Sequence, residues 1–220
     1  MPLQEPPPLR DDVAAVLQSA QQLVTWIAER QDGLEIKTDN ATRVPGVLFD
    51  LCLEHHVGIV QLVTSRINGS AFALIRSQFE SLVRGLWLHL SATADEVQEF
   101  VEKDWLPLKF GEMLDVIEQH ADFGDKVLYQ YKIEGWKAMN GYTHGGMHQI
   151  ARRVKTVSIE PNYQPEEIIE SLKASGLFAL LALLQIGRLA NSEKVIAEVD
   201  ERLSGQHFRD QFGRSAAVPG

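Results

Sequence analysis

The sequence predicts an all-α protein, an up-and-down bundle of about six to eight helices with an apolar helix at its centre. Hydrophobic residues recur at helical spacing along most of the chain, and they make up 45% of its 220 residues, enough for a sizeable core. The alternation typical of strands is confined to residues 156–159. We expect one helical domain over residues 11–204, between a disordered N-terminal tail (1–10) and a loose C-terminal tail (205–220).

The first two predicted helices cover residues 11–31 and 45–67. Asp11 or Asp12 can cap the first helix, and the Asp-Gly pair after residue 31 ends it. The second helix has Pro45 in its first turn, where a missing N–H costs nothing, and the Asn-Gly pair that follows predicts a break.

The third predicted helix, residues 70–90, carries two faces that can pack. One face is apolar, and the other combines small residues with leucines, so this helix should lie inside the bundle. Between the two faces, Arg76, Glu80 and Arg84 follow one another at intervals of four, and opposite charges at that spacing can pair.

The middle of the chain predicts shorter helices. Residues 94–121 should form two helices or one kinked helix, because Pro107 disfavours a continuous one. A further helix is expected over residues 125–139, with the following Asn140-Gly141 pair as its stop.

The last two predicted helices begin at Pro165 and after Ser192. Proline and two acids favour a helix start at residue 165, and the helix is apolar all round over residues 177–189. Such a helix must lie either in the middle of the bundle or in a subunit interface. Ser192 can cap a final helix that runs to about residue 203.

Composition excludes several classes of protein. A net charge of −9 argues against a broad DNA-binding surface, although a small site for one or two phosphates remains open. The single cysteine, Cys52, lies among leucines, so we expect a buried thiol in a reducing compartment. No signal peptide is evident, and the most apolar run is shorter than the roughly 20 residues that span a bilayer. These observations predict a cytoplasmic protein without membrane contact.

Two groups of residues could carry chemistry. The first is the charged series Arg76, Glu80 and Arg84, since charges on a helix packed on two sides must pair or serve a ligand. An ion pair that anchors neighbouring helices explains the same residues without any function. The second is the string at residues 140–146, where His144 lies among glycines that allow close approach. A helix end followed by a tight turn produces a similar string.

His144 and His148 also have the helical spacing of two metal ligands, but a glycine stands where zinc proteases carry their glutamate. A metal site would need a third ligand, such as His120 or Glu118, and nothing in the spacing demands one. We therefore predict no metal site and no cofactor. His55 and His56, on the second predicted helix, are expected to be core or boundary residues.

The strings RSQFE (residues 76–80) and YTHG (residues 142–145) resemble a group of bacterial helical proteins of unknown function that are distantly similar to the HEPN superfamily. The resemblance covers about residues 45–190 in helix order. HEPN proteins are helical bundles, commonly homodimers. Many are metal-independent endoribonucleases of toxin–antitoxin and phage-defence systems, and others are noncatalytic nucleotide-binding or scaffold modules.

The HEPN signature is an arginine, usually followed by a polar residue, then four to six positions and a histidine. Asn140 through His144 resembles the second half of that signature, and Met139 stands where the arginine would be. If the bundle brings Arg76 beside His144, the arginine could stabilise a phosphorane while the histidine deprotonates a ribose 2′-hydroxyl. Glu80 would then hold Arg76. The residues expected to bind substrate are Asn140, Tyr142, Thr143 and Arg84.

The resemblance thus implies an RNA- or nucleotide-directed module of a bacterial stress or phage-defence system, of the metal-independent endoribonuclease type and homodimeric. Two alternatives remain. A noncatalytic interaction protein could use Arg76, Glu80 and His144 as a polar network that fixes helix packing. A small-molecule or metal-binding bundle could use His144 and His148.

Overall fold

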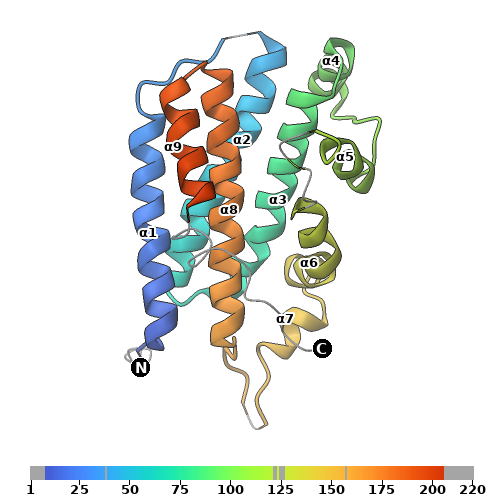
Figure 1. The fold of residues 1–220 in the computed structure, drawn as a ribbon. Coiled ribbons are helices and arrows are strands. Elements are labelled where there is room, and N and C mark those ends of the chain that lie inside the picture. The colour runs from blue at the N-terminus through green and yellow to red at the C-terminus, as the bar shows by residue number, and fades with distance from the viewer. Residues whose placement is uncertain (1–7, 38, 121–122, 124–126, 157, 206–220) are drawn as a thin grey trace.

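The computed structural model is a bundle of helices, as the sequence predicts (Figure 1). It describes residues 8–37, 39–120, 123, 127–156 and 158–205. Within these residues there is no strand, only an isolated bridge between Val154 and Ile159. The helices of the described residues are α1 (Asp11–Gln31), α2 (Asn40–Thr64), α3 (Asn68–Leu90), α4 (Ala94–Lys103), α5 (Phe110–Ile117), α6 (Val127–Thr143), α7 (Met147–Ala151), α8 (Pro165–Leu189) and α9 (Glu193–Ser204).

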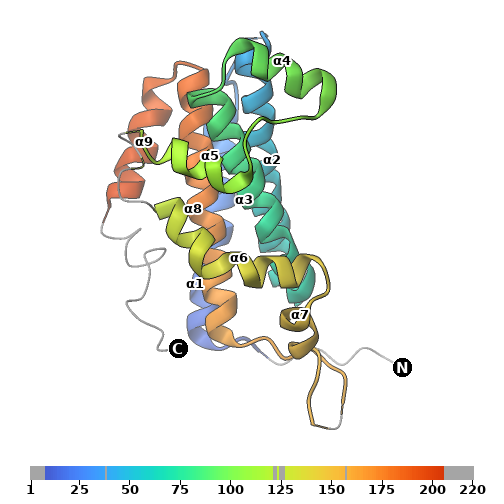
Figure 2. The same ribbon diagram turned by 90° about the vertical axis from the view of Figure 1, so that its right-hand side faces the viewer.

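The long helices α1, α2, α3 and α8 run side by side, and α8 lies among them (Figure 1). It packs against α1, α2, α3 and α9, so the apolar helix is the central one of its own chain. The helices α4 to α7 form a second layer beside the long helices, in which α5 and α6 pack against α3, α4 against α2 and α7 against α6. In this layer α6 crosses the long helices at a steep angle (Figure 2). The interruption predicted near Pro107 is real and separates α4 from α5.

The core is centred on α3 and α8. Phe79 and Phe178 are fully buried and stack with ring centroids 4.9 Å apart. Both predicted faces of α3 are packed, because Leu82 and Leu86 are buried on one side and Gly85 and Leu88 on the other. Burying each large side chain contributes roughly 1.5–3 kcal/mol, so α3 is anchored on both sides.

A line of buried polar groups crosses the core between α2, α3 and α8. His56 Nδ1 lies 2.7 Å from Ser175 Oγ, and Gln78 Nε2 donates to the Ser175 carbonyl over 3.0 Å. Burial lowers the pKa of His56 to about 4, so the imidazole is neutral. Cys52 is also fully buried, which raises the pKa of its thiol, and the expectation of a buried thiol is confirmed.

The start of α2 differs from the prediction. The helix begins at Asn40, where Asp39 accepts a hydrogen bond from the Thr42 N–H over 3.0 Å, and Pro45 lies inside it rather than in the first turn. An Asp N-cap thus starts the helix ahead of the proline. At the other end of α2 the break occurs at Arg66, with a φ of 62°, and the Asn-Gly pair opens α3.

Other helix ends also need correction. α1 has Arg10 as its N-cap residue without a side-chain cap, and Asp12 instead accepts from the Val13 N–H over 2.8 Å. α6 continues past Asn140-Gly141 to Thr143, while its predicted start at Asp125 lies outside the described residues. The Ser192 cap is confirmed, since Ser192 Oγ accepts from the Val195 N–H over 3.4 Å. Of the two predicted tails, residues 1–7 and 206–220 lie outside the described residues.

By length and composition α2, rather than the apolar run of α8, could cross a membrane. A core helix of a soluble bundle has the same properties, and α2 packs against α3 and α8 along its length. Its buried residues include Phe49, Leu53 and Ile59.

Candidate functional site

The charged series on α3 forms as its spacing predicts. Arg76 Nε donates to Glu80 Oε1 over 2.7 Å, and Arg84 Nη2 lies 3.8 Å from Glu80 Oε2. The side chains of Arg76 and Glu80 are 21% and 22% exposed, whereas Arg84 is 44% exposed. Glu80 therefore holds Arg76 firmly and Arg84 loosely.

His144 lies at a sharp corner between α6 and α7. Its N–H donates to the Asn140 carbonyl over 3.0 Å, and Gly145, with a φ of 65°, turns the chain in the left-handed region that suits glycine. A Cβ on Gly141 would lie 2.9 Å from Cδ2 of His148, so the glycine lets α7 fold back onto α6. The corner leaves the His144 side chain exposed.

Thr143 joins this corner to α3. Its Oγ1 lies 2.9 Å from the Met139 carbonyl and 3.3 Å from the carbonyl of Ala73. Ala73 lies one turn before Arg76 on α3, so the contact between Thr143 and Ala73 places His144 level with Arg76.

Arg76 and His144, which are 68 residues apart in sequence, are in direct contact through Nη1 and Nε2. A guanidinium can only donate, so Nε2 must be the accepting nitrogen. For a neutral imidazole, this contact places the ring proton on Nδ1.

Trp136, on α6, supports the guanidinium from another side. The Arg76 Cζ atom lies 5.2 Å from the centre of the Trp136 ring, in cation–π range. Trp136 also stacks on Phe110, with ring centroids 4.6 Å apart. Arg76 is thus oriented by a carboxylate, an aromatic face and an imidazole.

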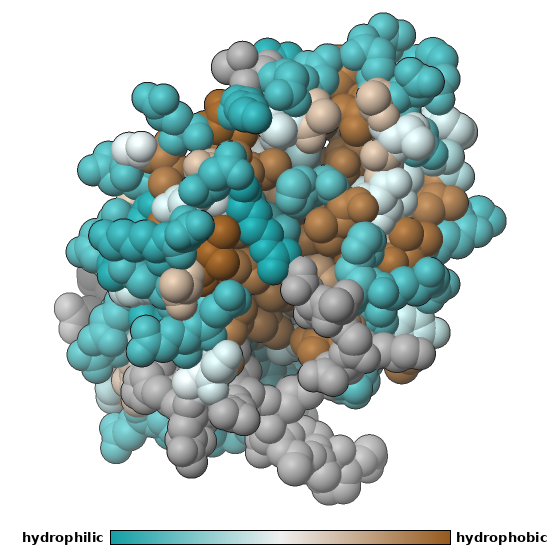
Figure 3. Space-filling model, turned by 45° about the horizontal axis from the view of Figure 1, so that its top comes forward, coloured by the Kyte–Doolittle hydropathy of each residue, from teal (hydrophilic) through white to brown (hydrophobic). Residues whose placement is uncertain are grey.

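An open cavity of about 380 Å³ begins beside Arg76. Its charged lining consists of Arg76, Glu80, Arg84 and Asp104. Its apolar lining consists of Phe100, Leu106, Leu108, Phe110, Met113 and Trp136. Its volume lies within the roughly 300–1,000 Å³ of small-molecule sites, and it combines apolar walls with a few charges as such sites do. His144 does not line this cavity, but it contacts Arg76, which does. In Figure 3, hydrophobic side chains show at the surface on the side where Figure 1 places α4 and α5.

Three of the four predicted binding residues, Asn140, Tyr142 and Thr143, do not line this cavity. The ring of Tyr142 packs edge-on against Phe72, and burial raises its pKa to about 12, with the carboxylate of Glu167 adding to the effect. Its hydroxyl interacts with Arg152. The Oδ1 atom of Asn140 is buried without a hydrogen-bond partner. The structure thus brings together Arg76, Glu80, Arg84, Thr143 and His144, and it turns Tyr142 toward α8.

No group of three or more His, Cys, Asp or Glu residues in the described part of the chain is arranged to hold a metal ion. His148 packs over Gly141 and tilts against Tyr142. The other ligands considered from sequence are engaged elsewhere, since His120 contacts Ser91 Oγ at 3.1 Å and Glu118 accepts from the Tyr129 N–H.

Sequence reasoning missed Trp136 and Asp104 as parts of the site. Trp136 lies in the helix predicted over residues 125–139, and the crossing of α6 over α3 turns it toward Arg76. Asp104 gives no sequence signal, because its relevance depends on the loop between α4 and α5 folding back over α3.

Fold and site together define a class: an all-helical bundle with an arginine–glutamate–histidine cluster beside an open cavity that charged and apolar residues line together. The chain belongs to a family described as "Family of unknown function (DUF6988)", which matches residues 49–213. The matched region contains every residue of the cluster. Neither the comparison with curated proteins nor the comparison with solved structures gave a match.

Proposed function

We propose that this protein cleaves RNA without a metal ion, using Arg76 and His144 as its catalytic pair. The observation that carries the proposal is the contact between a guanidinium from α3 and an imidazole from the end of α6, at the edge of an open cavity. A pair that only fixed helix packing would be expected to be fully buried with its polar atoms satisfied. His144 is instead exposed, and Arg76 is 21% exposed.

The chemistry needs a base and an anion stabiliser. Neutral His144 takes the proton of the ribose 2′-hydroxyl on Nε2, and the 2′-oxygen attacks the adjacent phosphorus. The bond from phosphorus to the 5′-oxygen breaks, and that oxygen leaves with a proton from solvent. Arg76 stabilises the negative charge of the phosphorane. The products are a 2′,3′-cyclic phosphate and a 5′-hydroxyl.

The free site holds its base in the correct form. Because Arg76 donates to Nε2, the imidazole keeps the lone pair that accepts the proton on that atom. Substrate phosphate would draw the guanidinium away from Nε2 and so release the lone pair. Glu80 acts as a positioning residue, since its carboxylate fixes Arg76 Nε at 2.7 Å. Arg84 and Thr143 are proposed to bind the substrate.

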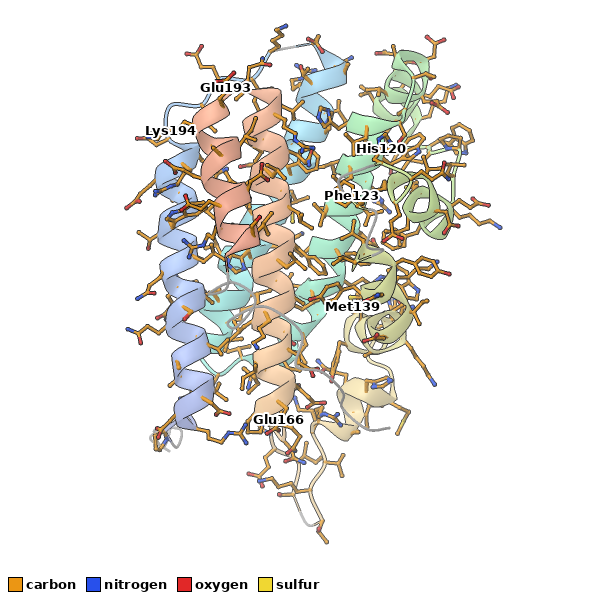
Figure 4. All side chains as sticks on the ribbon, viewed as in Figure 1. His120, Phe123, Met139, Glu166, Glu193 and Lys194 are labelled. Carbon is orange, nitrogen blue, oxygen red and sulfur yellow. The ribbon has the colours of Figure 1, made fainter. Side chains whose placement is uncertain are left out.

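The HEPN-like part of the proposal rests on the histidine half of the signature. Met139, where the arginine is expected, is buried between α6 and α3 (Figure 4), so a guanidinium there would face the core. We propose that Arg76 supplies the guanidinium from the neighbouring helix instead. A cytoplasmic homodimer acting in bacterial stress or phage defence remains a proposal from the resemblance alone. Because α8 is covered within its own chain, a dimer would use another surface.

The test is incubation of the purified protein with single-stranded RNA in excess chelator. We expect cleavage by the wild type, and a loss of at least about 100-fold in Arg76→Ala and His144→Ala, the scale of one acid–base or oxyanion group. His55→Ala is the matched control, since His55 is a partly exposed histidine on α2, away from the cluster. It should cleave as the wild type does.

The alternatives give different results. If Arg76→Ala loses its cooperative unfolding transition and no RNA is cleaved, the cluster is a packing network and the proposal is wrong. If cleavage stops in chelator and returns with a divalent metal, the metal-binding alternative replaces it.

A further inference from the structure

The cavity beside Arg76 contains one cation and one anion that do not pair with each other. Arg84 makes only its long contact of 3.8 Å with Glu80, and Asp104 has no ion pair or side-chain hydrogen bond with any other described residue. Both residues line the same cavity, yet they lie beyond salt-bridge distance. Two opposite charges held apart in one cavity leave room for a ligand that offers both acceptors and donors.

The backbone holds Asp104 in position. It is the C-cap residue of α4, its N–H donates to the Phe100 carbonyl over 2.9 Å, and its φ of 49° lies in the left-handed region. Aspartate tolerates that region better than most residues, so the backbone at the end of α4 places Asp104 beside the cavity.

The walls between these charges are apolar and partly aromatic. Phe100, Leu106, Leu108 and Met113 line the cavity together with Phe110. The Trp136 ring lies against Phe110 and Arg76, so a ligand meets its edge. A flat heterocycle suits this mixed lining, because its faces stack on aromatic side chains while its polar edges meet the charged groups.

We infer that the cavity binds a guanine base, with Asp104 accepting from N1–H and N2–H and Arg84 donating to O6 and N7. One part of this inference rests on the proposed function: the bound guanine belongs to the nucleotide whose 2′-hydroxyl reacts. Arg76 links the two places, because the same guanidinium lines the cavity and touches His144.

The chemistry separates guanine from the other bases. Guanine alone presents two adjacent donors to a carboxylate on one edge and two acceptors to a guanidinium on another. Adenine and cytosine offer an amino group beside an acceptor nitrogen, and uracil offers a single N–H between two carbonyls. A carboxylate facing any of those acceptors is repelled. One good bidentate contact corresponds to a preference of roughly 5- to 150-fold.

The test measures nucleotide binding, which does not depend on cleavage. Wild-type protein is titrated by calorimetry with 3′-GMP, 3′-AMP, 3′-CMP and 3′-UMP. We expect 3′-GMP to bind at least fivefold more tightly than the other three. Asp104→Asn and Arg84→Gln should each remove most of that preference. The matched control is Asp115→Asn, which changes an exposed aspartate on α5 that does not line the cavity, and it should keep the preference.

The outcomes separate this inference from the proposed function. Equal binding of the four nucleotides, no binding of any, or a guanine preference that survives in Asp104→Asn would overturn the guanine site. A guanine preference in a protein that cleaves no RNA would support the site and contradict the proposed function. Cleavage of RNA without regard to the base before the cut would support the proposed function and contradict the guanine site.

Discussion

Nη1 of Arg76, on α3, donates to Nε2 of His144, at the end of α6. The contact joins two helices that belong to different layers of the bundle, and it occurs where Thr143 also reaches the carbonyl of Ala73. The geometry of the site therefore depends on how α6 and its corner lie on α3. The following predictions test the parts of that arrangement separately.

Replacing Glu80 with alanine should impair the site more than the fold. An ion pair at i, i+4 on a partly exposed helix contributes about 0.3–0.5 kcal/mol, so the free energy of unfolding should change by less than about 1 kcal/mol. RNA cleavage should fall about tenfold or more, because Arg76 loses the carboxylate that orients it. Denaturant titration and cleavage rates check the two effects. A loss of stability above 3 kcal/mol with cleavage intact would refute the positioning role of Glu80.

Replacing Gly141 with alanine should open the corner that presents His144. The new Cβ would lie within 3.0 Å of His148 Cβ and closer to its ring, so α7 must move away from α6. Cleavage should drop several-fold. Gly135→Ala is the control on the same helix, since its Cβ would lie 3.4 Å from the Met139 methyl, and activity should be kept. Equal activity in both variants would mean that the corner does not position His144.

Replacing Gly85 with alanine should destabilise the core. A Cβ there would lie 2.7 Å from Cε1 of Phe49, a fully buried ring that cannot yield, and overpacking costs typically 1–3 kcal/mol. Gly58→Ala, with Leu74 at 3.4 Å, should be neutral or stabilising by up to about 1 kcal/mol through helix propensity. Thermal unfolding of the two variants checks these expected stabilities. A melting temperature of Gly85→Ala at or above that of the wild type would contradict the prediction.

Stability should fall as the pH drops from about 6.5 to about 4. Burial lowers the pKa of His56 to about 4 in the folded state, while the unfolded imidazole titrates near 6.5. In that window the unfolded chain binds more protons, so acid favours unfolding by up to roughly 3 kcal/mol from this residue. The denaturation midpoint of the wild type should fall across this range more steeply than that of His56→Gln. Parallel curves for the two proteins would show that His56 does not cause the effect.

The sequence predicted the fold well because helical periodicity is a strong signal over long segments. The two packed faces of α3 followed directly from the spacing of its apolar residues, and the apolar surface of α8 left two positions, the middle of the bundle or a subunit interface, of which the structure shows the first. Helix ends were less predictable. At Asn140-Gly141 the pair looks like a stop, but the absence of a Cβ on Gly141 serves the packing of His148, and the turn comes at Gly145 instead.

The candidate site was predictable only in part. The Arg76–Glu80 pair lies on one helix, so its spacing was sufficient to predict it. The contact with His144 could only be stated as a condition, because it depends on how two helices cross. Trp136 and Asp104 join the site through the placement of α6 and of the loop after α4, which no local pattern encodes. The same placement turns Tyr142 away from the cavity.

The most direct test of the central claim is the chemistry of the RNA ends after incubation in excess chelator. Mass spectrometry of the fragments should find 2′,3′-cyclic phosphate and 5′-hydroxyl ends with the wild type. Neither should form with His144→Ala or when the substrate is 2′-O-methylated at every ribose. Fragments ending in 3′-hydroxyl and 5′-phosphate, or cleavage of the methylated RNA, would contradict attack by a 2′-oxygen and with it the role assigned to Arg76 and His144.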